Sequence, residues 1–151
     1  MTREPTLHER AVRLLARREH SRLELKRKLA AYADDPAELD ALLDELVRSR
    51  LLSDDRYAEA RAHSLSRRFG SLRVAHDLKQ QGVGEAVLER VVAEARRSDL
   101  ERAREVWRKR FGEVPRSVQE RAKQMRFLQA RGFGSDVIRS VLRGDDVDDL
   151  S

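Results

Sequence analysis

The sequence has 151 residues, of which 39% are charged, 40% are hydrophobic and only 5% are aromatic, and it contains no cysteine. The lack of cysteine excludes disulfides, thiolate metal sites and a cysteine nucleophile. No apolar run approaches the ~20 residues of a membrane span. Residues 1–10 lack the apolar core of a signal peptide, so we expect a cytoplasmic protein with no membrane contact.

Helical signals recur along the whole chain, and apolar residues between them repeat at helical spacing. Capping boxes, in which a Ser or Thr hydroxyl and a Glu three residues later each bond a free backbone amide, are predicted at Thr6–Glu9, Ser21–Glu24, Ser98–Glu101 and Ser117–Glu120. Asp35 before Pro36 is a variant of this signal, and Ser53, Ser71 and Ser135 are simpler candidate caps. Five glycines stand where helices are expected to stop, at 70, 82, 112, 132 and 144. The predicted helices span 7–18, 22–33, 36–50, 54–69, 72–82, 85–97, 99–111, 117–131 and 135–143.

The second and third parts of the sequence resemble each other. Residues 78–92 align with residues 128–142 at a constant offset of 50, and Leu29 extends the period weakly into the first part. We therefore predict an all-α fold of tandem three-helix repeats, with units at 1–52, 53–97 and 98–143 and an insertion in the third unit around 113–120. Such repeats share a narrow core, which predicts an elongated and curved monomer whose functional surface is a long face.

Catalytic groups are not evident. The four histidines are far apart in sequence, and we expect each to be exposed or to cap a helix. The pairs Asp34–Asp35 and Asp54–Asp55 lie where helices begin, so capping explains them better than acid–base chemistry. Trp107 falls on an apolar stripe and is expected in the core, although it, Tyr57 and Phe127 are also candidates for stacking on bases. We predict no enzyme activity, no metal and no cofactor.

Basic residues are the strongest remaining signal. Residues 144–151 carry four Asp and no base, which leaves a net charge of +9 on residues 1–143, and residues 101–131 alone carry ten bases against four acids. We expect the acidic tail 144–151 to be disordered. A basic body favours contact with nucleic acid or with an acidic protein surface, although Arg-rich helices also serve solubility alone.

Recurring basic pairs suggest where that contact lies. Arg67–Arg68 and Lys109–Arg110 both precede Phe-Gly, which predicts a periodic ridge of charge. Arg68 and Arg110 rank lower, because they could instead fold back over their helix ends. The candidate binding residues are Arg67, Arg68, Arg73, Lys79, Lys109, Arg110, Arg126 and Arg131.

Several of these segments resemble the RecX family of recombinase regulators. The resemblance rests on residues 14–29, which open with Leu-Leu-Ala-Arg-Arg-Glu-His-Ser, and on Leu-Ser-Asp-Asp-Arg-Tyr-Ala at 52–58, where Ser53 replaces an Asp of the family pattern. It continues through 70–83, where Gln81 replaces a basic residue, and 123–133. The resemblance implies a protein that lies in the groove of a RecA–DNA filament and modulates ATP hydrolysis, strand exchange and repressor cleavage, in recombination and the SOS response. Its partners would be RecA and, weakly, single- and double-stranded DNA.

Other functions remain open from the residues alone. Short helices joined by glycine turns also fit a helix-turn-helix DNA-binding protein, although no single helix carries an evident set of base-reading residues. An adaptor for some other protein is the third alternative.

Overall fold

The computed structural model describes residues 3–143, and within this range the chain forms nine α-helices and one 3₁₀ helix. They are α1 (Leu7–Arg17), α2 (Arg22–Leu29), the 3₁₀ helix η1 (Ala30–Tyr32), α3 (Pro36–Arg48), α4 (Asp54–Leu65), α5 (Ser71–Gln80), α6 (Glu85–Arg96), α7 (Asp99–Arg110), α8 (Val118–Ala130) and α9 (Ser135–Leu142). The predicted all-α repeat architecture is confirmed. The acidic segment 144–151 lies outside the described residues.

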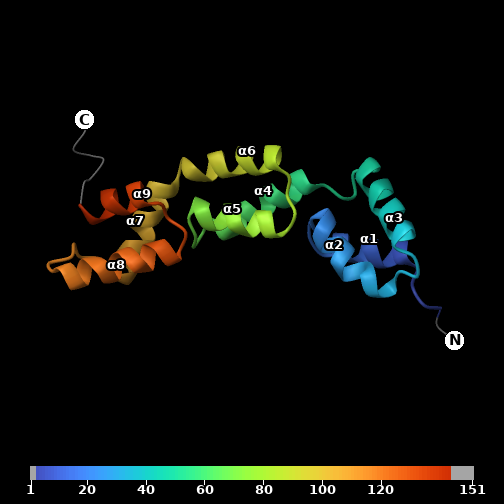
Figure 1. The fold of residues 1–151 in the computed structure, drawn as a ribbon, viewed down its shortest axis with the longest axis horizontal. Coiled ribbons are helices and arrows are strands. Elements are labelled where there is room, and N and C mark those ends of the chain that lie inside the picture. The colour runs from blue at the N-terminus through green and yellow to red at the C-terminus, as the bar shows by residue number, and fades with distance from the viewer. Residues whose placement is uncertain (1–2, 144–151) are drawn as a thin grey trace.

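The helices are arranged in three groups of three along one long axis (Figure 1). We call these groups unit 1 (α1–α3), unit 2 (α4–α6) and unit 3 (α7–α9). Each unit has its own small core, made where apolar residues three or four positions apart share a helix face. Leu25 and Leu43 are fully buried in unit 1, Val74 and Leu78 in unit 2, and Leu128 in unit 3. Trp107 packs against the unit 3 core as expected, and Tyr57 is buried in the core of unit 2.

Most helix starts follow the predicted caps. The hydroxyls of Thr6, Ser21, Ser53 and Ser117 each accept a hydrogen bond from the backbone amide three residues later, and Asp35 accepts one from the amide of Ala37. Three predicted caps are wrong. The Ser98 hydroxyl donates back to the carbonyl of Ala95 at 3.4 Å. Gly70 and Gly134, rather than Ser71 and Ser135, occupy the capping positions of α5 and α9.

His20 also departs from expectation, since only 1% of its surface is exposed. Its Nδ1 lies 3.1 Å from the carbonyl of Arg18, and the Lys28 ammonium donates to its Nε2 at 2.9 Å. The side chain therefore satisfies both ring nitrogens inside the α1–α2 turn, which a charge-based reading of the sequence does not reveal. The other three histidines are exposed.

In units 2 and 3, the glycine that follows the middle helix packs against the preceding unit. Gly82, after α5, lies so close to Leu23 in the first turn of α2 that a Cβ atom would come within 2.9 Å of its side chain. Gly132, after α8, lies closer still to Arg73 in the first turn of α5, where a Cβ would meet the Arg73 backbone nitrogen at 2.6 Å. Both glycines have a positive φ, at 76° and 88°. Glycine therefore lets the backbone at 132 approach the Arg73 backbone, and the backbone at 82 approach the Leu23 side chain.

The insertion predicted in unit 3 is divided between a connection and a helix. Residues 111–117 link α7 to α8, whereas residues 66–70 link α4 to α5, and α8 is also longer than α5. The connection is held in place by Gln124, which accepts from Trp107 Nε1 at 2.8 Å and donates to the carbonyl of Glu113 at 3.1 Å. Among the described residues, no helix is both long enough and apolar enough to cross a bilayer.

Candidate functional site: a cationic groove between units 2 and 3

Five of the eight candidate binding residues line one groove at the junction of units 2 and 3. Its volume is about 310 Å³, and we call it the cationic groove. The turn after α4, the last two turns of α7 and the end of α8 form its walls. The lining residues are Arg67, Arg68, Glu105, Val106, Lys109, Arg110, Phe127 and Arg131.

Arginines and phenylalanines stack alternately along this groove. The Arg131 guanidinium lies 5.2 Å from the ring centre of Phe127 and 5.6 Å from that of Phe69. Arg110 lies 5.8 Å from the ring of Phe127, so the Phe127 ring is shared by two arginines. Stacking on an aromatic face holds a guanidinium in place without using its N–H groups, which stay available for a ligand.

The charges of the groove are largely uncompensated. Lys109 forms an exposed ion pair with Glu105 at 3.3 Å. Arg67, Arg68, Arg110 and Arg131 form no ion pair with any described residue. Four arginines without a carboxylate partner in a concave surface create a positive potential, which attracts phosphates or acidic side chains. Because guanidinium groups remain protonated, they supply binding but no general base or nucleophile.

Of the three remaining candidates, one lies at the edge of the cationic groove and two lie outside it. Arg73 lies at the edge of the groove, with its guanidinium 5.0 Å from the Phe69 ring that Arg131 also contacts. Lys79 and Arg126 are exposed on α5 and α8 but do not line the groove. That these residues bind a ligand remains a prediction.

The two Arg/Lys-Arg-Phe-Gly segments are not structurally equivalent, which corrects the idea of a periodic ridge. Arg67 and Arg68 lie in the turn between α4 and α5, whereas Lys109 and Arg110 are the last two residues of α7. Gly70 caps α5 with φ −83°, whereas Gly112 follows α7 with φ +74°. The two pairs instead face one shared groove. The Arg110 guanidinium lies 5.7 Å from the ring centre of Phe111, the residue that caps the end of α7, and 5.8 Å from that of Phe127.

A buried network of ionic hydrogen bonds joins α7 to α5 and to the turn after α4 at this junction. The Asp99 carboxylate accepts from the Ser71 backbone amide at 3.0 Å and from the Ser71 hydroxyl, and Arg102 donates to it at 2.6 Å. Arg102 also donates to the carbonyls of Ser66 and Phe69, at 2.9 and 2.8 Å, which closes the end of α4. Burial lowers the pKa of Arg102, and the charge of Asp99 partly offsets that effect. The turn that carries Arg67 and Arg68 is thereby held against α7.

Sequence reasoning missed both the network and the stacking. The phenylalanines at 69 and 127 are separated by 58 positions, and nothing local shows that one arginine contacts both. A signal for the network does exist, because both Asp54 and Asp99 occupy the first position of the first helix of a unit. Asp54 plays the corresponding part between units 1 and 2, where its carboxylate accepts from the Arg22 amide, the first of α2, at 2.8 Å.

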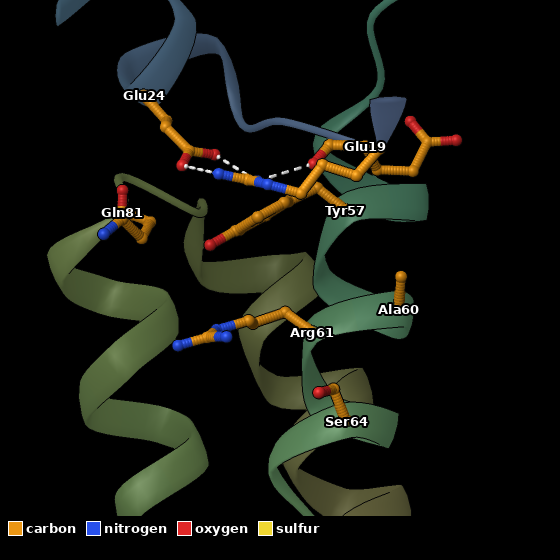
Figure 2. A pocket seen from close by; sticks show the side chains of 8 residues that line it. Glu19, Glu24, Tyr57, Ala60, Arg61, Ser64 and Gln81 are labelled. Carbon is orange, nitrogen blue, oxygen red and sulfur yellow. Dashed lines mark hydrogen bonds and ion pairs between the residues drawn. The ribbon is translucent and has the colours of Figure 1, made fainter. Parts of the chain in front are cut away.

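A second groove, of about 370 Å³, lies at the junction of units 1 and 2 (Figure 2). Its lining is Arg18, Glu19, Glu24, Tyr57, Ala60, Arg61, Ser64 and Gln81. We call it the neutral groove, because its two cations and two carboxylates balance. Arg18 donates to both oxygens of Glu24, at 3.0 and 2.5 Å, and Arg61 donates to both oxygens of Asp77, at 3.0 and 3.2 Å.

The surroundings of Glu24 and Tyr57 determine which of these two groups in the neutral groove carries a proton. Burial, the largest single effect, would raise the pKa of Glu24, but the hydrogen bonds and the charge of Arg18, together with nearby charges that include Lys28, leave the pKa below its ordinary value. Burial raises the pKa of Tyr57, and the nearby charges of Glu24 and Asp77 raise it further. At neutral pH the Tyr57 hydroxyl therefore keeps its proton and can donate a hydrogen bond.

Comparisons with known proteins agree with this architecture. Residues 53–92 match the family model for the second three-helix domain of RecX, and residues 98–142 match that for the third. The chain is 47% identical to Regulatory protein RecX of Leptothrix cholodnii, over 91% of this chain and 88% of the relative. It is also 47% identical to Regulatory protein RecX of Chromobacterium violaceum, over 96% and 94% of the two chains.

A solved structure shares the fold. The crystal structure of RecX from Lactobacillus salivarius superposes with a TM-score of 0.77, at 17% identity, over 91% of this chain and 93% of that one. The sequence relatives cover nearly the full length of the chain and are named regulatory proteins. The chain therefore belongs to the RecX family of regulatory proteins.

Proposed function

We propose that this protein binds the RecA–DNA nucleoprotein filament and lowers its ATPase, strand-exchange and coprotease activities, and that the cationic groove carries the contact with DNA phosphates. Membership of the RecX family supports the regulatory role. The single observation that supports the site is the convergence of four unpaired arginines and Lys109 on one concave surface.

An elongated array suits a filament. Three units in a row present separated surfaces along one axis (Figure 1), and a filament repeats its protomers along an axis. Several weak contacts on one molecule combine into a stronger one, because the later contacts form at high effective concentration. Phosphate contacts add a term that weakens with salt, since each neutralised phosphate releases counterions.

The test compares two triple variants that lose the same charge. Arg67→Ala/Lys109→Ala/Arg131→Ala removes three groove cations, and Arg96→Ala/Arg108→Ala/Arg121→Ala removes three exposed cations outside the groove lining. RecA ATPase on single-stranded DNA is titrated with each protein, after thermal unfolding has shown that both variants fold. We expect the groove variant to need at least tenfold more protein for half-inhibition. The slope of log affinity against log salt should flatten by about 2 units, at ~0.7 per phosphate contact.

Two outcomes would contradict the proposal at different levels. Wild-type protein that does not inhibit RecA at all would remove the filament function and favour a helix-turn-helix DNA-binding protein. Equal losses in the two variants would keep the function but show that general positive charge, rather than the cationic groove, carries it.

A further inference from the structure

The neutral groove and the cationic groove are built from corresponding segments. The neutral groove lies between the turn after α1, the helix α4 and the residue after α5. The cationic groove lies between the turn after α4, the helix α7 and the residue after α8. Ser64 is the eleventh residue of α4 and Lys109 the eleventh of α7, while Gln81 follows α5 as Arg131 follows α8. Two cations of the cationic groove are thus replaced by uncharged hydrogen-bonding side chains in the neutral groove.

The charges that remain in the neutral groove are already satisfied. Arg18 is held by Glu24, and its Nη1 also donates to the carbonyl of Glu19 at 2.9 Å. Arg61 is held by Asp77 through two bonds. Because a polyanion would have to compete with carboxylates that accept these bonds, the neutral groove offers nucleic acid little electrostatic attraction.

Tyr57 supplies an unused hydrogen-bonding group. Its side chain extends from α4 into the space in front of Gln81 (Figure 2), and only 4% of the residue's surface is exposed. Its hydroxyl forms no hydrogen bond with any described residue. Every fully buried side-chain oxygen or nitrogen of the described residues has a partner, so the unpartnered Tyr57 hydroxyl must be accessible from the groove that it lines. A hydroxyl on a nearly buried ring that reaches only the groove is positioned for a ligand.

We propose that the neutral groove binds an uncharged polypeptide segment of a recombinase protomer, with Tyr57, Gln81 and Ser64 bonding its peptide groups. The proposal rests on the proposed function and divides it, because the cationic groove then contacts DNA and the neutral groove contacts protein. Hydroxyl and amide groups match the N–H and C=O of a peptide, whereas phosphates favour unpaired guanidinium groups.

The test removes two of these groups without changing charge. Tyr57→Phe/Gln81→Ala is compared with Tyr32→Phe/Gln80→Ala, which makes the same changes at exposed positions outside the groove. Binding is measured by fluorescence anisotropy on preassembled RecA–ssDNA filaments and on the same ssDNA alone. We expect the groove variant to bind filaments about 25-fold more weakly, at roughly fivefold for each of the two lost hydrogen bonds, with unchanged ssDNA affinity. The control should match wild type on both probes.

A second variant separates peptide binding from simple electrostatics. Ser64→Lys/Gln81→Arg gives the neutral groove the charges of its counterpart, and it should bind filaments more weakly despite its higher positive charge. Tighter filament binding by this variant would overturn the proposal, as would wild-type filament affinity in Tyr57→Phe/Gln81→Ala. A parallel loss of ssDNA affinity would assign the neutral groove to nucleic acid. If wild-type protein has no affinity for filaments, the proposed function itself fails, which is a distinct result.

Discussion

The Asp99 carboxylate accepts a hydrogen bond from the backbone amide of Ser71 at 3.0 Å, although the two residues belong to different units. Ser71 opens the middle helix of unit 2, and Asp99 opens the first helix of unit 3. Asp54 makes the same kind of contact with the amide of Arg22 one junction earlier. An acidic residue at the start of each later unit thus caps a helix of the unit before it, where the exposed amides and the helix dipole favour a negative charge.

Replacing Asp99 should weaken the junction of units 2 and 3. Asp99→Ala leaves the Ser71 amide unbonded and Arg102 without its counter-charge, at a site where the carboxylate side chain is 5% exposed. We expect the free energy of unfolding in urea to fall by about 3 kcal/mol, because removing one partner of a buried pair leaves the other uncompensated. Asp54→Ala, at the more accessible junction, should cost about 1 kcal/mol, the value of a single cap. Equal costs would mean that the buried pair adds nothing.

Gly132 should be required for the two units to stay together. Gly132→Ala places a Cβ 2.6 Å from the Arg73 backbone nitrogen and forces a side chain into a φ of +88°. Gly134→Ala is the matched control, since no atom lies within 4 Å of the added Cβ. Trp107, the single tryptophan, reports on unit 3 alone, whereas circular dichroism reports on all helices. We expect the fluorescence transition to precede the dichroism transition only in Gly132→Ala, because repeat arrays lose cooperativity when an interface breaks.

Coincident transitions in Gly132→Ala would show that the junction tolerates the extra atom. The wild-type protein and Gly134→Ala should unfold with both probes superimposed. Gly134→Ala should lose less than about 1 kcal/mol, the effect of a poorer residue at a helix cap.

Arg50 should be replaceable by glycine with a gain in stability. It lies two residues after the end of α3 and has φ +65°, the only positive φ at a non-glycine among the described residues. A side chain in the left-handed region costs roughly 1–2 kcal/mol, and glycine avoids that cost while adding some chain entropy to the unfolded state. Arg50→Gly is therefore expected to raise the free energy of unfolding by about 0.5–1 kcal/mol. Ala41→Gly, at an exposed position inside α3, should lower it by a similar amount, and a loss in both variants would contradict the strain assignment.

The part of this fold that the sequence predicts is the part that depends on local signals. Hydroxyl caps and apolar spacing act within four residues, so the nine helices and their order follow from the chain itself. The predicted helix over 22–33 is instead divided, with an α-helix that ends at Leu29 and a 3₁₀ helix over Ala30–Tyr32. Ser98 failed as a predicted cap because its hydroxyl bonds the carbonyl of Ala95 in the preceding turn. The Ser71 hydroxyl instead bonds Asp99 across a unit boundary.

The candidate site was only partly predictable for the same reason. Charge marks arginines and lysines as candidates, but the junction decides which of them converge. Arg67 and Lys109 meet across units 2 and 3, while Lys79 and Arg126 lie outside the groove. The neutral groove could not be predicted from composition, because its arginines are cancelled by Glu24 and Asp77, and only the fold brings those partners together.

His20 should make stability depend on pH in the window around and below about pH 6.5, where an unfolded histidine titrates. Burial is the largest effect on the pKa of His20 and lowers it, and the nearby charges of Arg18 and Lys28 lower it further. The carbonyl of Arg18 and the charge of Glu24 raise the pKa, but the net shift is downward. The folded protein therefore holds His20 neutral, with Lys28 donating to its Nε2, whereas the unfolded chain takes up a proton near pH 6.5. The stabilising contribution is complete above that value and is lost as the pH falls below it, because the unfolded state then binds more protons.

The measurement is the free energy of unfolding in urea as a function of pH. Wild-type stability should fall on acidification by up to about 1.4 kcal/mol per pH unit, the limit for one proton. The carboxylates with lowered pKa, Glu9 and Glu24, titrate below this window and leave the slope to His20. His20→Gln should flatten the profile, whereas His63→Gln, at an exposed position in α4, should retain the wild-type slope. A wild-type profile that is flat across this range would mean that His20 is protonated equally in both states, and that the contact with Lys28 does not keep it neutral.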